Sequence, residues 1–245
     1  MKKLVVGNWK MNGSIESLSV IETLATRHHD STIDILICVP APYLVPAKQI
    51  AGSLYIGAQD CHTASQGAYT GDVSAYMLSD ISASHVIIGH SERRAAHNET
   101  NTLVREKALI AQLADLCPII CIGETLSERE NEHTLNVIHE QLIGSLDPNL
   151  NSSSFVIAYE PVWAIGTGLV PSETEIEEVH GFCRQYLLEH FGNSAEYIQI
   201  LYGGSVKGSN AERIFALQNV DGALVGSASL LADDFSVIIE ALENV

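Results

Sequence analysis

The chain has 245 residues, of which 46% are hydrophobic and 18% are charged, and its formal net charge is −17. This length can bury a sizeable core and still form one domain if the fold is an α/β barrel. The acidic surplus makes nucleic acids and anionic membrane surfaces poor partners, and neither is expected to bind. A small anionic substrate is compatible with this charge, because salt screens it over about 8 Å and local donors then decide binding.

The five cysteines are scattered and form no CxxC pair. Cys117 and Cys121 fall on one predicted strand, where four residues span roughly 13 Å, too far for a disulfide. The sequence therefore predicts reduced thiols in a cytoplasmic protein. No metal-ligand spacing occurs, and His28-His29, at a helix end, is interpreted as a solvated pair. The start of the chain predicts no signal peptide, and no apolar run is long enough to span a membrane.

Short apolar runs recur along the chain and alternate with amphipathic segments. Most runs are continuous Val/Ile/Leu stretches, which is typical of parallel strands buried on both faces. Apolar stripes at helical spacing predict helices over residues 17–27, 102–116, 126–146, 172–191, 210–217 and 229–243. The strands are predicted to begin near Leu4, Asp34, Leu54, His85, Pro118, Phe155, Ile198 and Ala223.

Eight strand–helix alternations without a break in composition favour a single (β/α)8 barrel over residues 1–245. A doubly wound sheet is the alternative architecture. In a barrel, function lies at the carboxyl ends of the strands. The residues expected there decide the chemistry.

Glu160 is expected at the end of the sixth strand. Pro161 follows it, then an apolar loop that reaches Gly168. A carboxylate beside a segment that can close over it suggests a base in a pocket from which water is excluded. A strand-terminal glutamate with a packing loop explains this stretch equally well.

Lys10 and His90 follow the first and fourth strands. A packed lysine stem can hold its ammonium toward a phosphate or an oxyanion, and an imidazole can donate to a carbonyl oxygen. A surface lysine and a core histidine are the plain alternatives. Glu92, Arg93 and Arg94 are interpreted as an ion-pair network that braces the loop, although Glu92 is close enough to His90 to act in catalysis.

Glycine turns at Gly203-Gly204 and Gly226 follow the last two strands, where barrels commonly bind phosphate through backbone N–H groups. With Glu160, His90 and Lys10, they point to proton abstraction next to a carbonyl in a small phosphorylated substrate. Such a reaction needs no cofactor, since no electrons leave the substrate. The loop would exclude water from an enediolate that can otherwise eliminate its phosphate.

These motifs also carry a family resemblance. Residues 8–12 (NWKMN), 88–94 (IGHSERR), 121–125 (CIGET), 158–168 (AYEPVWAIGTG), 202–206 (YGGSV) and 222–226 (GALVG) resemble those of the triosephosphate isomerases. The resemblance spans the chain, and the run from 159 to 168 is highly specific. It implies a TIM barrel that interconverts dihydroxyacetone phosphate and D-glyceraldehyde 3-phosphate, in glycolysis and gluconeogenesis.

Carried over residue by residue, the resemblance implies Glu160 as the base, His90 as the electrophile, and Lys10 and Asn8 as substrate contacts. Gly166, Ser205 and Gly226, with the adjoining Ser227, match phosphate-binding positions. A neutral histidine beside a glutamate base, and loop closure over both, are known features of this family. The family is usually homodimeric, which implies that the loop 61–72, with Thr70 near its tip, inserts into a partner. A surface loop with no partner is the alternative.

The chain departs from the family pattern at two positions. Ser227 stands where a second glycine is usual, and Asp72 stands where a glutamate is more usual. Serine keeps the backbone N–H of glycine but tolerates positive φ poorly, at a cost of roughly 1–2 kcal/mol. We therefore expect a negative φ at Ser227 and an intact reaction.

Two other classes of function stay open at this point. One is a Schiff-base aldolase on the same barrel, with Lys10 as its nucleophile. The other is a phosphate-sugar binding module without catalysis. In the aldolase, Glu160 and its loop have no specific role. In the binding module, the full set of candidate catalytic groups has no explanation.

Overall fold

The computed structural model describes residues 2–167 and 169–245, in which eight parallel strands close into a barrel in chain order, β1 to β8. Gly168, the last residue of the predicted loop after Glu160, lies outside these residues. The closure pairs Leu4 of β1 with Gly222 of β8, which excludes the doubly wound sheet. The strands are β1 Leu4–Asn8, β2 Asp34–Cys38, β3 Tyr55–Ala58, β4 His85–Ile88, β5 Cys117–Ile122, β6 Val156–Tyr159, β7 Gln199–Tyr202 and β8 Gly222–Val225.

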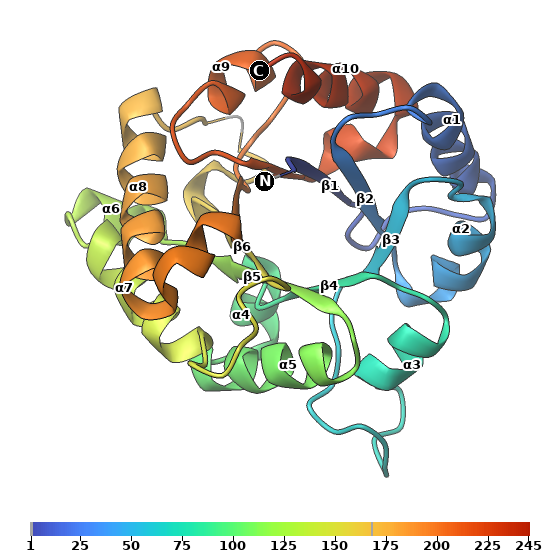
Figure 1. Cartoon of the computed structure of the whole chain (residues 1–245), viewed down its shortest axis with the longest axis horizontal. Helices are drawn as coiled ribbons and strands as arrows, with labels where there is room; N and C mark the ends of the chain where they lie inside the picture. Colours follow the sequence, from blue (N-terminus) through green and yellow to red (C-terminus); the bar gives the residue numbers. More distant parts are fainter. Residues whose placement is uncertain (1, 168) are drawn as a thin grey trace.

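Helices surround this barrel and cover its outer face (Figure 1). Each predicted strand start lies within one residue of the observed one. The α-helices are α1 Ser19–Arg27, α2 Leu44–Ile50, α3 Ala75–Asp80, α4 Ser91–His97, α5 Asn101–Leu113, α6 Leu126–Glu130, α7 Thr134–Ser145, α8 Glu173–Phe191, α9 Ala211–Phe215 and α10 Ala232–Glu243. Short 3-10 turns are η1 Glu16–Leu18, η2 Ala41–Tyr43, η3 Val162–Ala164, η4 Gly192–Tyr197 and η5 Ser227–Leu230.

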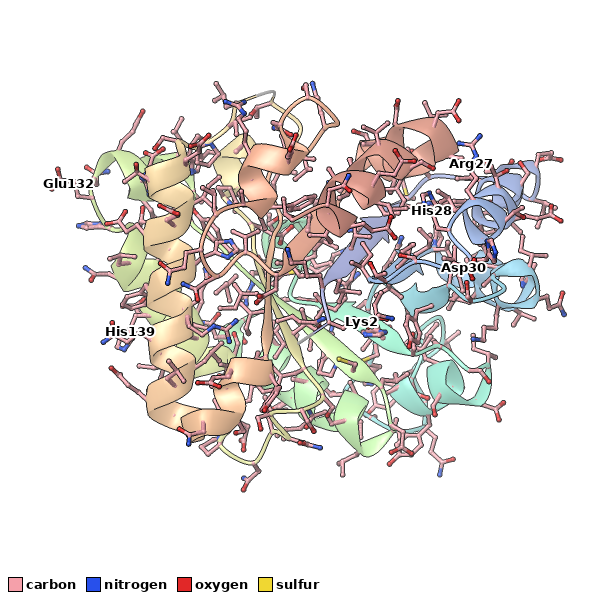
Figure 2. All side chains as sticks on the ribbon, turned by 45° about the horizontal axis from the view of Figure 1, so that its top comes forward. Lys2, Arg27, His28, Asp30, Glu132 and His139 are labelled. Atoms are coloured by element: carbon pink, nitrogen blue, oxygen red, sulfur yellow. The ribbon has the colours of Figure 1, made fainter. Side chains whose placement is uncertain are left out.

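Two predicted helices are each broken in the structure, because one residue leaves the helical conformation. The segment 126–146 splits into α6 and α7 at Glu132, whose φ of 59° is left-handed. Figure 2 labels Glu132 at this turn. The segment 229–243 splits at Leu231, whose extended φ of −123° separates η5 from α10. Apolar periodicity continues through both breaks, so the pattern alone does not reveal them.

The core has two layers that follow the alternation of the strands. Alternate strand positions fill the inside of the barrel with apolar side chains: Leu4, Val6, Leu36, Cys38, Ile87, Ile119, Cys121, Val156, Ala158, Leu201 and Leu224. The other strand positions pack against the helices in a larger cluster. Burial of each leucine or isoleucine stabilises the fold by about 1.5–3 kcal/mol. The same alternation decides which residues face the barrel mouth.

His28 corrects the interpretation of His28-His29 as a solvated pair. His28 is buried, and its Nε2 lies 2.9 Å from the Ser236 hydroxyl of α10. Burial lowers the pKa of His28. His29, by contrast, is exposed beside Asp30. Figure 2 labels His28 between Arg27 and Asp30, at the end of α1.

Three further features concern the cysteines, the helices and the loop after β3. All five cysteines are free thiols. Among the described residues, no helix combines the length and apolar character needed to cross a membrane. The loop between β3 and α3, which contains residues 61–72, projects away from the barrel (Figure 1).

Candidate active site

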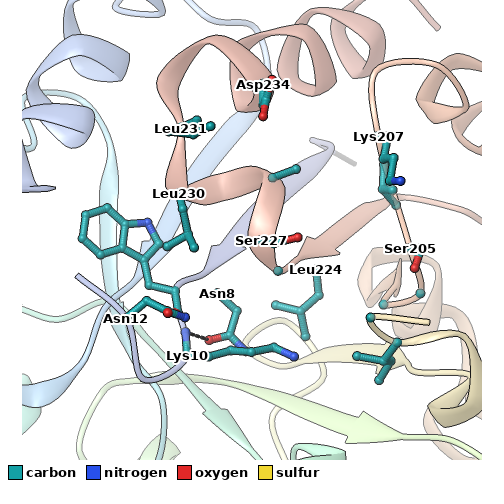
Figure 3. A pocket seen from close by; sticks show the side chains of 18 of the residues that line it. Asn8, Lys10, Asn12, Ser205, Lys207, Leu224, Ser227, Leu230, Leu231 and Asp234 are labelled. Atoms are coloured by element: carbon teal, nitrogen blue, oxygen red, sulfur yellow. Dashed lines mark hydrogen bonds between the residues drawn. The ribbon is translucent and has the colours of Figure 1, made fainter. Parts of the chain in front are cut away.

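A cavity of about 700 Å³ opens at the carboxyl ends of the strands. It is lined by every residue that the sequence predicts for the site: Asn8, Lys10, His90, Glu160, Gly166, Ser205, Gly226 and Ser227. The structure thus gathers side chains from five strand ends that are far apart in the sequence. Figure 3 shows the part of this cavity around Asn8, Lys10, Ser205 and Ser227.

Glu160 points into the cavity because of the alternation of β6. Val156 and Ala158 face the barrel interior, so the side chain two residues later faces the same way. Its neighbours at the ends of β5 and β7 are both glycines. A Cβ at Gly123 would lie 1.7 Å from the Glu160 carbonyl oxygen, and one at Gly203 would lie 2.8 Å from its Cγ. Gly123 thus makes room for the backbone of Glu160, and Gly203 makes room for its side chain.

Glu160 is 2% exposed, and its carboxylate is hydrogen-bonded on both oxygens. Oε1 lies 2.9 Å from His90 Nε2, and Oε2 accepts the backbone N–H of Ser91 at 3.0 Å. Burial raises the pKa of Glu160, but His90 and the Ser91 N–H outweigh it, and the pKa lies below its ordinary value. Glu160 is therefore an ionised carboxylate held at rest.

His90 caps the first turn of α4, which fixes its ring. Its Nδ1 accepts the backbone N–H of Glu92 at 3.2 Å, so Nε2 carries the proton that points at Glu160. Burial lowers the pKa of His90, whereas the Glu160 carboxylate raises it, and the net direction is upward. The Glu92 N–H opposes protonation at Nδ1, since a protonated Nδ1 cannot accept it.

Lys10 adopts a strained backbone conformation at the cavity wall. Its φ of 52° is left-handed, which costs a residue with a side chain about 1–2 kcal/mol. Two side chains hold it there. Asn8 Oδ1 accepts the Lys10 N–H at 3.0 Å, and Gln59 Nε2 donates to the Lys10 carbonyl at 3.0 Å. Strain that is maintained in this way is common at functional sites.

The Lys10 ammonium lies 2.6 Å from Glu92 Oε1. Glu92 thus pairs with Lys10 and not with the two arginines next to it. Arg93 binds Asp60 and Glu99, both at 2.7 Å. Arg93 thus has the predicted bracing role, and Glu92, for which the network and catalysis were both open, lies outside the ion pairs of Arg93. The reason is the N-terminal turn of α4, which directs successive side chains to different faces.

Arg94 braces the turn between β4 and α4, which carries His90. Its guanidinium donates to the carbonyls of Gly89 and Cys121 and to Asn101, at 2.8, 3.1 and 2.6 Å. These bonds tie the end of β4 to β5 and α5. They fix the position from which His90 reaches Glu160.

The opposite end of the cavity offers the backbone of small residues beside larger side chains that include Lys207, Leu230 and Asp234 (Figure 3). Gly203 and Gly204 follow β7, and Gly226 and Ser227 follow β8. Ser227 begins the 3-10 turn η5, and its φ is not positive, so the expected negative φ is confirmed. The Ser205 hydroxyl donates to the Ala164 carbonyl at 2.6 Å and so contacts the loop after Glu160.

Comparison with known proteins decides the family. The family model described as triosephosphate isomerase matches residues 3–242. A triosephosphate isomerase of Ruegeria pomeroyi is 56% identical and covers 99% of this chain and 98% of its own. One of a Ruegeria species is 53% identical, with 98% of both chains covered. The crystal structure of triosephosphate isomerase from Bartonella henselae superposes with a TM-score of 0.92, at 43% identity, and covers 98% of this chain and 99% of its own.

The chain belongs to the triosephosphate isomerase family. It is therefore an enzyme of the isomerase class, and its (β/α)8 barrel is the fold of the family. Across the described residues, no group of three or more His, Cys, Asp or Glu side chains is arranged to hold a metal ion.

In this member of the triosephosphate isomerase family, the first turn of the loop after Glu160 is hydrogen-bonded to a buried glutamate, Glu124. Glu124 Oε1 accepts the Trp163 indole N–H at 2.8 Å and the Tyr159 hydroxyl at 3.2 Å. Its backbone carbonyl accepts the Val162 N–H at 3.0 Å. Burial raises the pKa of Glu124. The first turn of the loop, η3, is thus fastened to the end of β5.

Sequence reasoning missed three contributors to the site. Gln59 and the Ser91 N–H hold Lys10 and Glu160, and Glu124 holds the loop. Each lies within three residues of the end of a strand, which is the signal that could have identified them. Their partners, however, lie on other strand ends, and no local pattern connects them.

Proposed function

We propose that this cavity interconverts dihydroxyacetone phosphate and D-glyceraldehyde 3-phosphate through an enediolate, with Glu160 as the base and His90 as the electrophile. The observation that carries the proposal is the division of the cavity. An ionised, buried Glu160 lies 2.9 Å from the N–H of His90 at one end, and a glycine-lined pocket for a phosphate lies at the other. The three-carbon chain of the substrate would run between the two ends.

Glu160 would take a proton from C1 of the ketone, and the electron pair of that bond would form the C1–C2 double bond of the enediolate. The negative charge then develops on the carbonyl oxygen at C2. The Nε2–H of His90 and the ammonium of Lys10 are the donors that would stabilise it. Return of the proton to C2, with transfer of the O1 proton to O2, yields the aldehyde. Atoms and electrons balance without a cofactor.

The resting contacts of Glu160 imply a movement during the reaction. Both carboxylate oxygens are occupied by His90 and Ser91, so the carboxylate must give up these partners to reach the substrate carbon. His90 then loses the charge that raises its pKa, while burial and the Glu92 N–H continue to favour the neutral ring. The same step would release the base and leave a neutral imidazole as donor to the substrate oxygen.

The loop after Glu160 would serve as a lid. It begins at η3 on Glu124, contacts Ser205 through Ala164, and contributes Ile165 and Gly166 to the cavity wall. Its closure would exclude water and retain the enediolate phosphate. Gly166, Ser205, Gly226 and Ser227 are the proposed phosphate contacts, and Asn8 and Lys10 the proposed contacts to the substrate chain.

A coupled assay on glyceraldehyde 3-phosphate with the purified protein, together with solvent-deuterium incorporation at C1 or C2, tests the proposal. Isomerisation with exchange supports it. Covalent trapping at Lys10 by borohydride and substrate would favour the aldolase instead. The ion pair of Lys10 with Glu92 opposes that alternative, because a Schiff-base lysine must become neutral. Saturable binding without exchange would indicate a binding module.

A homodimer formed through the loop 61–72 is the proposed assembly. A second cavity, of about 590 Å³, lies at the base of this loop and is lined by Met11, Cys61, Arg93 and Lys107 among others. Met11 is 96% exposed, and Tyr69, near the tip of the loop, is half exposed. Apolar groups of this kind beside an open cavity support insertion of a partner's loop.

Deletion of Tyr69 and Thr70 tests this assembly. Sedimentation should then give monomers. Activity should also fall strongly, because the cavity that would receive the partner's loop is lined by Met11, and Met11 is the chain neighbour of Lys10. Unchanged mass and activity would reject the dimer.

The unit that assembles is proposed to be the whole chain, residues 1–245, as one barrel. The cytoplasm is the proposed compartment, supported by the five free thiols; cell fractionation tests it.

A further inference from the structure

The segment between β7 and α9 is held by one amide side chain. Asn210 Oδ1 accepts the backbone N–H of Lys207 at 2.8 Å, and Asn210 Nδ2 donates to the carbonyl of Ser205 at 3.1 Å. The Lys207 carbonyl in turn accepts the N–H groups of Asn210 and Ala211, both at 3.0 Å. The turn is therefore closed by both backbone and side chain.

These bonds fix two successive peptide planes. The Ser205 carbonyl sets the plane between Ser205 and Val206, and the Lys207 N–H sets the plane between Val206 and Lys207. Ser205, Val206, Lys207 and Gly208 all line the active-site cavity. Asn210 does not line it. The side chain acts on the cavity only through the backbone that it holds.

We propose that Asn210 is a positioning residue for the phosphate group of the substrate, a statement that rests on the proposed function of this cavity. The Lys207 N–H is occupied by Asn210, so the N–H that these bonds aim is that of Val206, which lies in the plane set by the Ser205 carbonyl at the cavity wall. A backbone N–H that is aimed before the phosphate arrives binds it more tightly, since ordering it on binding consumes affinity. Asn210 holds the segment from Ser205 to Lys207 in one shape, which also keeps the Ser205 hydroxyl and the Lys207 side chain at the cavity wall.

The chemistry of the position requires an amide. An asparagine offers one acceptor for the Lys207 N–H and one donor for the Ser205 carbonyl. An aspartate keeps the acceptor but sets a carboxylate oxygen against the Ser205 carbonyl. An alanine loses both bonds. Each neutral hydrogen bond contributes about 1 kcal/mol, so loss of the pair corresponds to a change of roughly tenfold to thirtyfold in phosphate affinity.

The test compares purified Asn210→Ala and Asn210→Asp with the wild-type enzyme. Inorganic phosphate is the probe, measured as a competitive inhibitor, beside KM and kcat for the triose phosphate. The inhibition constant and KM should rise roughly tenfold to thirtyfold in Asn210→Ala and less, by about tenfold or below, in Asn210→Asp, and kcat should fall less in both. Asn151→Ala is the matched control, because Asn151 Oδ1 accepts the backbone N–H of Ser153 at 3.1 Å in a loop remote from the cavity. It should alter neither constant.

Three outcomes separate this inference from the proposed function. If phosphate does not compete with substrate in the wild type, the proposed phosphate site fails and the inference fails with it. If phosphate competes but the Asn210 variants keep wild-type constants and lose only thermal stability, the inference alone is overturned. If neither variant folds, amide hydrogen exchange of the wild type decides, because a Lys207 amide that exchanges as fast as an unprotected one would contradict a preformed turn.

Discussion

The two ends of the active-site cavity are built by different means. At one end, Glu160, His90 and Lys10 are side chains with strong partners, and Glu160 and His90 are buried. At the other end, Gly203, Gly204 and Gly226 offer backbone and almost no side chain. The first end depends on which side chain is present, and the second on how the chain is folded. Substitutions at the two ends should therefore fail in different ways.

The largest effect is expected for Lys10→Met. Methionine keeps much of the stem and the strained φ of 52°, and it removes the charge. We expect kcat/KM to fall by about a thousandfold or more, about 4 kcal/mol of transition-state stabilisation. Steady-state kinetics and thermal unfolding check this, with Lys48→Met on α2 as the control. An active Lys10→Met protein with unchanged stability would remove Lys10 from the charged end.

The next effect is expected for Glu160→Asp. Aspartate keeps the charge and withdraws the carboxylate by about 1 Å, and misplacement of this size costs roughly 10²-fold in rate. The turnover number should fall far more than KM rises. Glu128→Asp in α6, which shortens a carboxylate of a helix cap, is the control and should leave both constants unchanged. Turnover close to wild type would show that Glu160 is not the base.

A smaller effect is expected at the backbone end, for Ser227→Gly. Ser227 has a negative φ within η5, so glycine can adopt the same conformation and present the same N–H. KM should change only a few-fold, and Ser227→Ala should behave similarly. A loss of activity of about a hundredfold, or about 2.7 kcal/mol, would mean that the hydroxyl itself binds the phosphate. The backbone description of this end would then be wrong.

The smallest effect is expected from pH at the same end. Sulfate is a suitable probe, because it keeps its charge in the neutral range, and backbone N–H groups do not titrate. Its inhibition constant should vary less than about twofold between about pH 5.5 and 8. At the charged end, the pKa of Glu160 lies below its ordinary value of 4.5. Protonation of Glu160 should therefore lower kcat/KM only at a pH below 4.5.

The stability that Glu160 contributes to the fold also depends on pH, because proton binding and folding are linked. The charged form of Glu160 is favoured in the folded protein, so the stability it contributes is present above pH 4.5 and is lost as the pH falls through the lower folded value. A sulfate affinity that instead follows a group titrating above 6.5 would show that the charge of His90 reaches the phosphate end. The two ends would then be electrostatically coupled.

The candidate site was predictable where a strand end exposes a reactive side chain. Glu160 follows an apolar run and precedes Pro161, and Lys10 and His90 occur in equivalent positions. The partner of Lys10 was not predictable. Glu92 lies 82 residues away, beside two arginines that offered a closer pairing. Asn210 gave no signal at all, because its effect depends on the backbone turn that it closes.

The sequence by itself determined the order of strands and helices and the reactive side chains at the strand ends, because burial and side-chain chemistry are properties of short segments. Only the tertiary structure decided that β1 pairs with β8, that Glu92 binds Lys10, and that Gly123 and Gly203 make room for Glu160. The breaks at Glu132 and Leu231 and the burial of His28 belong with these. Each depends on atoms from distant segments meeting within a few ångströms, and apolar periodicity carries no information about such meetings.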